Sequence, residues 1–196
     1  MNGSTPLGSD DKLLLAAIDL IADKGYNGVS TKEIAAAAGL SEKTLFRRFG
    51  TKRHLLESAF DRYHYGEEMK KLFAERLVGD LRQDLRLISR TYHDLMNRNR
   101  KMIMISIKDE GHLPGFQEMT RKHPQQFMEG LTEYFRTMTG KGKAVVPNPE
   151  LQAAAFLMMQ FGAFMNNLEN GGAFAGITLE GFIEESVEIF ARGGAL

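Results

Sequence analysis

Residues 30–53 read STKEIAAAAGLSEKTLFRRFGTKR, and this pattern predicts two short helices joined by a tight turn. Ser30 and Glu33 have the spacing of a capping box, in which each side chain bonds the backbone amide of the other residue at a helix start. Gly39 can adopt the left-handed backbone angles of a tight turn, and Ser41 is a favoured residue for starting the next helix. Two short helices joined in this way form a helix-turn-helix motif.

A third helix is predicted ahead of this motif, over residues 10–24. Its apolar residues recur at the spacing of one helix face, and they are Leu14, Ala17, Ile18 and Ile21. Gly25 follows as a common C-terminal stop. Ala35 lets the two motif helices approach closely, and Leu40 is expected to turn inward against the first helix. These segments predict an N-terminal domain of three helices over residues 1–51.

The helix that starts at Ser41 concentrates positive charge on one side. Residues 41–53 contain five basic residues and one acidic residue, whereas the whole chain has a formal net charge of +0. Arginine and lysine pair with guanine edges and with phosphates, although a solvated helix face is the alternative interpretation. Because Leu45 and Phe49 are expected to point inward, we predict DNA contacts from the opposite side and its flanks: Ser30, Thr31, Ser41, Lys43, Thr44, Arg47, Arg48 and Lys52.

Residues 14–56 resemble the DNA-binding domain of TetR-type regulators. The matching positions include two alanines in the first helix and then Gly25, Tyr26, Ile34, Ala35, Ala38, Gly39, Ser41, Thr44, Leu45, Phe49, Lys52, Leu55 and Leu56. One position departs, because the family often has a tyrosine that touches a phosphate where this chain has Phe46. A phenyl ring cannot hydrogen-bond to a phosphate, so we expect Phe46 to pack against the first or fourth helix. The remaining residues resemble the family only in layout, which is normal for its ligand-binding domains.

The rest of the chain predicts a larger helical domain over residues 52–196, with no convincing strand. The expected helices cover residues 52–78, 80–97, 100–108, 115–139, 149–169 and 179–192. Pro124 lies inside the fourth of these, where it removes an amide donor and restricts the residue before it, so we expect a break or kink. The fold class is therefore all-α, with a three-helix domain followed by a larger helical ligand-binding and dimerisation domain.

Methionine and phenylalanine are frequent between residues 96 and 165. Flexible methionines suit pockets that accept varied apolar ligands, although ordinary core packing is the alternative for each residue. The expected effector pocket is lined by Met96, Met104, Phe116, Met119, Phe127, Tyr134, Met158, Phe161 and Met165. We predict a mostly apolar effector, or an amphipathic one whose polar head meets Lys101, Lys108, Arg121 or Lys122 at the mouth.

The last two predicted helices carry small and apolar residues on more than one side. A helix that is apolar all round needs two partners. Here these are its own core and the same helices of a second subunit, packed as a four-helix bundle. The expected dimer interface contains Ala154, Leu157, Gly162, Phe182, Ile183 and Ile189. The family resemblance implies the same homodimer.

Composition argues against several other classes of protein. The chain has no cysteine, which excludes disulfides, thiolate nucleophiles and cysteine-based metal sites and suits a cytoplasmic protein. We expect no signal peptide and no bilayer-spanning helix. The sequence has no nucleophile elbow, phosphate loop or paired-histidine zinc helix, so we expect neither an enzyme nor a cofactor. His112 lies near Asp109 and Glu110, but their spacing fits no metal site.

These features together predict a transcriptional regulator. The leading hypothesis is a repressor whose two recognition helices, one per subunit, enter successive major grooves of a palindromic DNA operator. A small-molecule effector that fits better when those helices are wrongly spaced would release the DNA. The alternative is a DNA-binding regulator or an architectural protein with no effector, although an architectural protein is usually basic and this chain is neutral.

Overall fold

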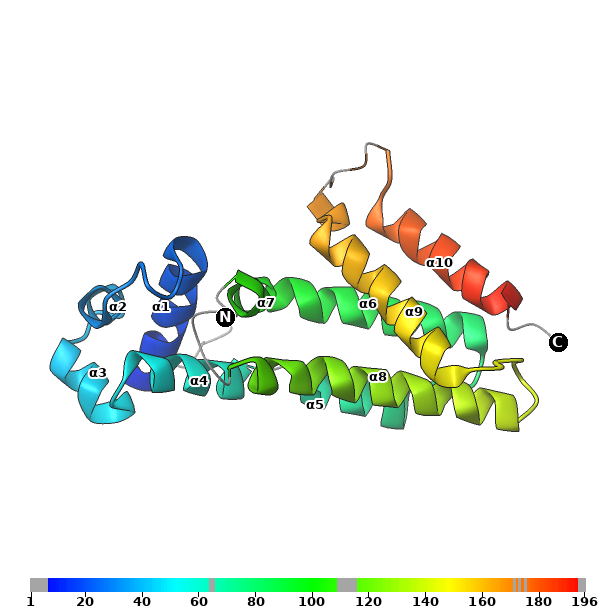
Figure 1. Cartoon of the computed structure of the whole chain (residues 1–196), viewed down its shortest axis with the longest axis horizontal. Coiled ribbons are helices and arrows are strands. Elements are labelled where there is room, and N and C mark those ends of the chain that lie inside the picture. The colour runs from blue at the N-terminus through cyan, green and yellow to red at the C-terminus, as the bar shows by residue number, and fades with distance from the viewer. Residues whose placement is uncertain are drawn as a thin grey trace, which may run out of the picture. The chain divides into compact units, whose positions relative to one another are not determined.

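A computed structural model describes residues 7–63, 66–108, 116–170, 172, 174 and 176–193. Every regular element in these residues is a helix, which confirms the predicted all-α class (Figure 1). The described residues form two compact units. The first contains those up to residue 63 and those from 99 to 121, and the second contains those from 66 to 98 and from 122 onward.

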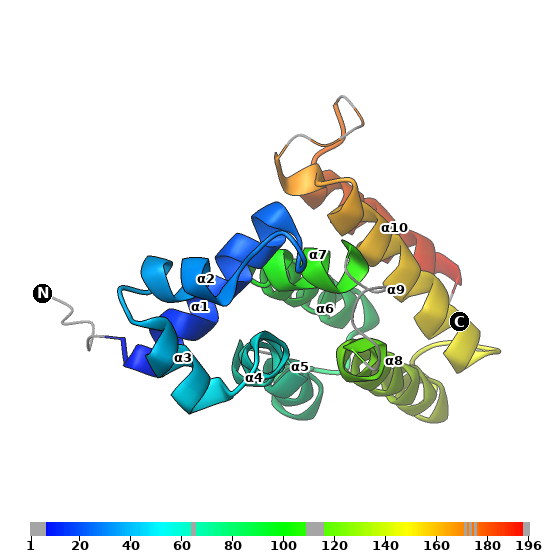
Figure 2. The same ribbon diagram turned by 60° about the vertical axis from the view of Figure 1, so that its left-hand side comes forward.

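The first unit is built mainly from α1 (Ser9–Lys24), α2 (Thr31–Ala37), α3 (Glu42–Phe49), α4 (Lys52–Tyr63) and α7 (Arg100–Lys108) (Figure 2). The central helix is α1, since it packs against α2, α4 and α7. Its predicted apolar face is confirmed, because the four side chains that define it are buried: Leu14, Ala17, Ile18 and Ile21. Leu55 and Leu56 of α4 are buried in the same core. A functional boundary between residues 51 and 52 stays a prediction.

The predicted cap and turn of the motif are present. The Ser30 hydroxyl accepts a bond from the Glu33 amide at 3.2 Å, and the Glu33 carboxylate accepts one from the Ser30 amide at 2.9 Å, which confirms the capping box. The bond from the Ser30 amide is the main reason that the pKa of Glu33 is lowered to about 2. Gly39 has a φ of 68°, and the Ser41 hydroxyl accepts from the Thr44 amide at 3.2 Å. The turn and the start of α3 therefore lie where the sequence predicts them.

The second unit is built from α5 (Gly66–Lys71), the π-helical turn η1 (Leu72–Arg76), α6 (Leu81–Arg98), the greater part of α8 (Phe116–Gly140), α9 (Pro149–Met165), the 3-10 turn η3 (Leu168–Asn170) and α10 (Leu179–Gly193). Three of these helices, α6, α9 and α10, pack on one another. Figure 1 shows α9 and α10 side by side, coloured from yellow to red. These three helices form the body of the second unit.

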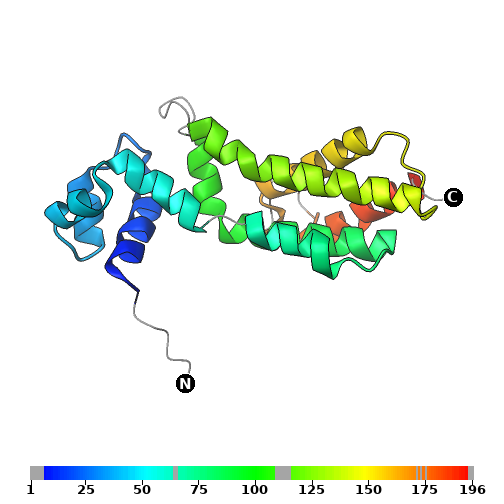
Figure 3. The same cartoon turned by 90° about the horizontal axis from the view of Figure 1, so that it is seen from below.

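The path of α8 differs from the prediction. The sequence predicted a break or kink at Pro124, but the helix continues from Phe116 to Gly140 without a break (Figure 3). A proline costs a helix one backbone bond, and a helix of 25 residues retains many others. The single helix predicted over residues 52–78 is found as α4, α5 and η1, with residues 64 and 65 outside the described part.

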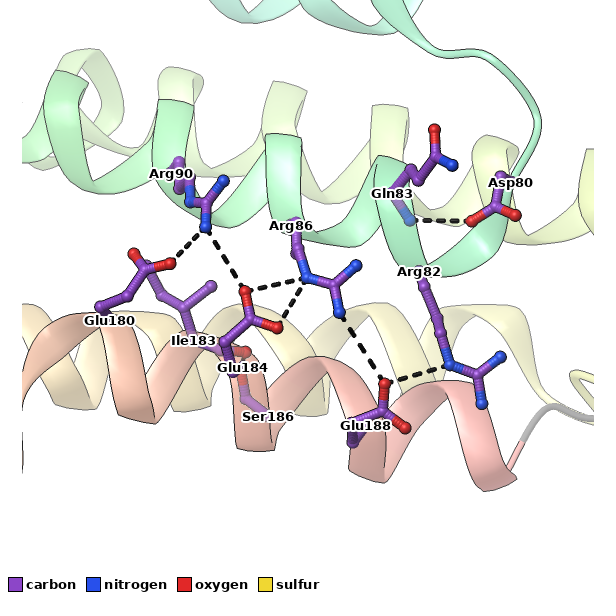
Figure 4. Close-up of polar contacts among 10 residues, drawn as sticks. All are labelled: Asp80, Arg82, Gln83, Arg86, Arg90, Glu180, Ile183, Glu184, Ser186 and Glu188. Carbon is purple, nitrogen blue, oxygen red and sulfur yellow. Dashed lines mark hydrogen bonds and ion pairs between the residues drawn. The ribbon is translucent and has the colours of Figure 1, made fainter.

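A ladder of ion pairs joins α6 to α10 on the surface of the second unit (Figure 4). Three arginines of α6 face three glutamates of α10 at four-residue intervals: Arg82 with Glu188 (3.0 Å), Arg86 with Glu184 (2.7 and 2.8 Å) and Arg90 with Glu180. The pairs run in opposite order along the two helices, so α6 and α10 are antiparallel. We call these six residues the α6–α10 ladder.

A chain of buried polar side chains links the same region from inside. His93 of α6 donates from Nε2 to the side-chain oxygen of Gln160 on α9 at 3.0 Å, and the Gln160 amide donates to the Ser186 hydroxyl on α10 at 3.1 Å. All three residues are buried. Burial disfavours the charged form of an imidazole, and it is the main reason that the pKa of His93 is lowered. Burial therefore favours the neutral imidazole of His93, with its proton on Nε2.

Asp84 ties the start of α6 to the preceding loop and to α8. Its carboxylate accepts bonds from the amides of Val78 and Gly79, each at 2.8 Å, and from the Tyr134 hydroxyl at 2.9 Å. Asp84 is fully buried. Burial and the neighbouring carboxylate raise the pKa of Tyr134, so its hydroxyl keeps its proton as a donor. Three donors from two separate segments thus converge on one carboxylate.

Candidate nucleic-acid interface

The exposed face of α3 carries two cations without a partner. Leu45 points into the core of the first unit and is fully buried. Lys43 and Arg47 lie on the opposite side of the helix and are exposed. Neither makes an ion pair or a side-chain hydrogen bond in the described part of the chain. The predicted outward direction of these two residues is confirmed, and both remain available to an external anion.

Phe46 lies on the same exposed face, contrary to the expected packing against the first or fourth helix. Its side chain is 47% exposed. The reason is angular, because successive residues of a helix are turned by about 100°. When Leu45 points into the core, Phe46 is turned aside, and Phe49 supplies the partly buried aromatic ring of α3.

The predicted hydroxyl contacts are all engaged at helix starts. Ser30 caps α2, as described above, and the Thr31 hydroxyl donates to the Glu42 carboxylate at 2.6 Å. Ser41 caps α3, and its hydroxyl lies 2.9 Å from the hydroxyl of Thr44. The bonds of Thr31, Ser41 and Thr44 place three of these hydroxyls at the start of α3, and Ser30 lies at the start of α2. Their contact with DNA stays a prediction.

Arg48 is directed toward α1 rather than along the face that holds Lys43 and Arg47. Its guanidinium lies 2.6 Å from the carboxylate of Asp10, in an exposed ion pair. Such a pair is worth about 0–1 kcal/mol. A phosphate could therefore replace Asp10 at little cost.

Lys52 connects the start of α4 to the loop between α1 and α2. Its ammonium donates to the carbonyl oxygens of Tyr26 at 2.6 Å and Val29 at 2.7 Å, and it lies 4.2 Å from the centre of the Tyr26 ring. Lys52 thus holds the loop in place, and its contact with a phosphate stays a prediction.

The second unit contains a cavity of about 470 Å³ between α5–η1 and α8. Its walls are mainly apolar and include Met69, Phe73, Ala74, Leu77, Gly130, Tyr134, Thr137 and Met138. Lys70, Glu133 and Lys141 supply its charged groups. Gly130 lets α8 approach η1 closely, because a Cβ atom at this position would lie 2.7 Å from the Phe73 ring. The volume falls within the range of small-molecule sites.

The nine predicted pocket residues are dispersed. Tyr134 lines the cavity. The others lie elsewhere: Met96 and Phe127 are buried in the second unit, Met104 is on α7 of the first unit, and Met158, Phe161 and Met165 are exposed on α9. The side chains of Phe116 and Met119 lie outside the described residues. The sequence analysis missed the wall formed by α5 and η1, whose signal is the helical spacing of Met69, Phe73 and Leu77.

Lys101, which was expected to meet the polar head group of an effector, does not line the cavity. Lys101 is bonded to Asp19 at 2.8 Å within the first unit. The lysines that line the cavity are Lys70 and Lys141. Lys70 lies 2.8 Å from Glu67, whereas Lys141 makes no ion pair in the described residues. Lys141 is therefore the available cation of the cavity.

Apolar side chains on α9 and α10 are left uncovered by the second unit. Leu151, Met158 and Ile189 are 68%, 71% and 59% exposed. The predicted interface residues Ala154, Leu157, Gly162 and Phe182 are partly exposed. Ile183 is 1% exposed and belongs to the core, so it offers no surface to a second subunit. The exposed residues are the ones to consider for an interface.

Within the described ranges, no helix has the length and apolar character needed to cross a bilayer. The same residues contain no group of three or more histidines and carboxylates placed to hold a metal ion. His112, Asp109 and Glu110 lie outside the described residues.

Two protein families match parts of the chain. Residues 13–59 match bacterial regulatory proteins of the tetR family, and residues 83–192 match the C-terminal domain of AefR-like transcriptional repressors. The HTH-type transcriptional regulator YvkB of Bacillus subtilis (strain 168) is 29% identical over 185 residues, which are 94% of this chain and 96% of that protein. The matches therefore extend over both units.

Solved structures share the same arrangement of helices. NalD, the secondary repressor of the MexAB-OprM multidrug efflux pump in Pseudomonas aeruginosa, has a TM-score of 0.71 at 23% identity over 95% of each chain. AibR in complex with isovaleryl coenzyme A and operator DNA has a TM-score of 0.70 at 22% identity, over 94% of this chain and 99% of that one. At these identities the similarity shows the fold.

Proposed function

Because the chain belongs to the tetR family of bacterial regulatory proteins and is a helix-turn-helix transcriptional regulator, we propose that it is a repressor whose homodimer binds a palindromic operator and is released by a small molecule. The observation that carries the proposal is the pair of unpartnered cations, Lys43 and Arg47, on the exposed face of α3 within the described residues. The second helix of such a motif enters the major groove, where lysine and arginine bind guanine.

The other predicted contacts serve to position the protein on DNA. Ser30, Thr31, Ser41 and Thr44 bring hydroxyls to the starts of α2 and α3, and Arg48 and Lys52 bring cations. Contacts with phosphates fix the register of a protein on the duplex but carry no sequence information. We therefore assign sequence recognition to Lys43 and Arg47 and orientation to the other six residues.

A binding experiment tests this assignment. An operator is first selected from random-sequence duplexes with the purified full chain, and its affinity is then measured for Lys43→Ala and Arg47→Ala at matched salt. Each base contact is worth about 1–3 kcal/mol, so each variant should bind at least fivefold more weakly while melting like the wild type. Arg76→Ala removes an exposed charge from η1 of the second unit and serves as the control. Wild-type affinity in both α3 variants would place recognition elsewhere.

The homodimer is supported by the exposed apolar residues of α9 and α10. A monomer that left Leu151, Met158 and Ile189 in water would present an apolar patch of the kind that marks protein interfaces. Ile189→Arg should give a folded monomer in sedimentation, since that position is exposed in the single chain. Ile183→Arg is the matched comparison and should unfold the chain, because Ile183 is buried. A wild-type monomer at micromolar concentration would exclude the dimer.

The cavity between α5–η1 and α8 is the proposed effector site. Its apolar walls favour an apolar or amphipathic molecule, and Lys141 could meet an anionic head group. A protein of the same fold supports a small-molecule effector, since AibR was solved in complex with isovaleryl coenzyme A and operator DNA. The alternative is a regulator with no effector. In that case the cavity would have no role.

A thermal-shift screen with acyl chains, hydrophobic drugs and sugars separates these alternatives. A ligand at 100 times its Kd should add about 2.7 kcal/mol to the stability and should release the operator. Ala74→Phe fills the cavity and should abolish both effects, whereas Glu75→Phe, on the same turn but outside the cavity wall, should not. Release by sugars or metal ions alone would overturn the apolar site, and release by no compound would favour the alternative.

A further inference from the structure

Phe46 occupies an unusual position for a large apolar side chain. In the described part of the first unit, the exposed large hydrophobic residues are Leu7, Phe46 and Ile107. Single exposed apolar residues are normal on protein surfaces. Phe46 differs from the other two because it lies on α3, three residues after Lys43 and directly before Arg47.

The three side chains form one stripe on the helix. At about 100° per residue, Phe46, Lys43 and Arg47 fall in that order within an arc of about 100°. The two cations lie opposite the buried Leu45, and Phe46 forms the edge of the arc, about 100° from Leu45. The phenyl ring therefore lies beside two cations that have no partner within the described residues. An element that presents these cations to base edges presents the ring to base edges as well.

The major groove offers few groups that suit a phenyl ring. Adenine, guanine and cytosine present hydrogen-bond donors and acceptors there, and thymine adds a methyl group. A ring placed over a donor or acceptor would remove water from that group without replacing its bond, which is unfavourable. A ring placed over a thymine methyl buries two apolar surfaces against each other.

We propose that Phe46 is a specificity-determining residue that reads the 5-methyl group of a thymine beside the base pairs bound by Lys43 and Arg47. This inference rests on the proposed operator binding. The positions of Lys43 and Phe46 differ by about 4.5 Å along α3, and successive base pairs are about 3.4 Å apart. The thymine therefore lies within about two base pairs of a guanine in each half-site.

The test removes the methyl group and nothing else. Each symmetric pair of thymines in the selected operator is replaced in turn by 2′-deoxyuridine, and the affinity of the full wild-type chain is measured. Burial of one methyl is worth roughly a fourfold change in affinity, so one pair of replacements should weaken binding about fifteenfold across two half-sites. Phe46→Ala should bind the thymine and deoxyuridine operators equally well.

Two further variants sharpen the comparison. Phe46→Tyr keeps the ring and should keep the sensitivity to deoxyuridine, and so should Ile107→Ala, which removes an exposed apolar side chain from α7. Failure to select any operator would overturn the proposed function itself. A selected operator that tolerates every replacement, or equal loss for wild type and Phe46→Ala, would overturn the role of Phe46 alone. Equal weakening of Phe46→Ala on all duplexes would assign the ring to the sugar–phosphate backbone.

Discussion

The motif of the first unit and the interior of the second unit hold their polar side chains in opposite ways. Around α2 and α3, the capping bonds join residues three positions apart, such as Ser30 with Glu33, and they lie in water. In the second unit the bonds join distant residues, 50 positions apart for Asp84 with Tyr134 and 67 for His93 with Gln160, and they are buried. The first arrangement depends on local sequence, and the second depends on the whole unit being packed.

This difference predicts that substitutions of exposed and of buried polar side chains should lower the stability by different amounts. An exposed polar group can exchange its partner for water or for a phosphate at little cost. A buried group that loses its partner carries a full desolvation penalty. Substitutions on α3 should therefore change DNA binding with little effect on stability, whereas those in the interior of the second unit should change stability first.

The largest effect is expected at Asp84. Asp84→Ala removes the acceptor of three donors in or near the interior. An unsatisfied buried donor costs about 1–3 kcal/mol, so we expect a loss on the order of 3–5 kcal/mol in urea denaturation. Tyr134→Phe removes one of the three bonds and should cost about 1 kcal/mol. Equal and small losses for both variants would mean that the carboxylate does not organise this region.

A smaller effect on stability is expected at Lys52, where the first unit departs from the local pattern. Lys52→Ala removes two bonds to loop carbonyls, and a bond from a charged group is worth about 1.5–3 kcal/mol. We expect a loss of about 2–3 kcal/mol for the variant, because the ammonium is partly solvated. Arg53→Ala, at the next position, is the control for removing a charge.

The same Lys52 variant tests the phosphate contact. If the Lys52 ammonium also binds a phosphate, the slope of log affinity against log salt should shrink by about one unit. A lower stability with an unchanged slope would assign Lys52 to the loop alone.

The next effect concerns pH and His93. Burial lowers the pKa of this imidazole in the folded chain, whereas the unfolded chain binds the proton near pH 6.5. Above that pH both states are neutral and the stability is unaffected. As the pH falls below about 6.5, the unfolded state gains the proton first, and stability should fall by up to about 1.4 kcal/mol per pH unit until the folded pKa is reached.

His93→Gln should remove this acid-dependent loss while keeping a polar side chain beside Gln160. His54→Gln is the control, since His54 is exposed on α4, and it should leave the pH dependence in place. Denaturation curves between pH 5 and 8 measure both variants. An identical slope in wild type and His93→Gln would show that other groups dominate.

The smallest effect is expected from the α6–α10 ladder. Arg86 bonds Glu184 at the surface, where its side chain is 30% exposed. Surface ion pairs contribute about 0–1 kcal/mol, so Arg86→Ala should cost no more than about 1 kcal/mol, and 1 M salt should reduce the difference. A cost comparable with that of Asp84→Ala would contradict the contrast between surface and interior.

The elements that the sequence predicted correctly are those with local causes. The capping box, the turn at Gly39 and the buried face of α1 each follow from residues within one or two helical turns. Phe46 was misplaced for a physical reason, because an eight-residue helix with two aromatic residues does not reveal which ring faces the core.

The features that could not be predicted are those that depend on packing. No pattern in the sequence pairs Asp84 with Tyr134 or His93 with Gln160, since each pair meets only when separate helices come together. The cavity between α5–η1 and α8 has the same origin. Composition pointed to residues 96–165, whereas six of the fourteen residues that line the cavity come from residues 66–77.

The π-helical turn η1 supplies part of the cavity wall. A π turn holds one residue more than the α-helical turn it replaces, and Phe73 and Ala74 in η1 both line the cavity. Deletion of one residue would convert the turn to an α-helical turn and leave the residues on either side of it in phase, so the cavity wall would change only at η1 itself. One deletion could thus change the wall of the cavity at this turn without altering any residue of α3.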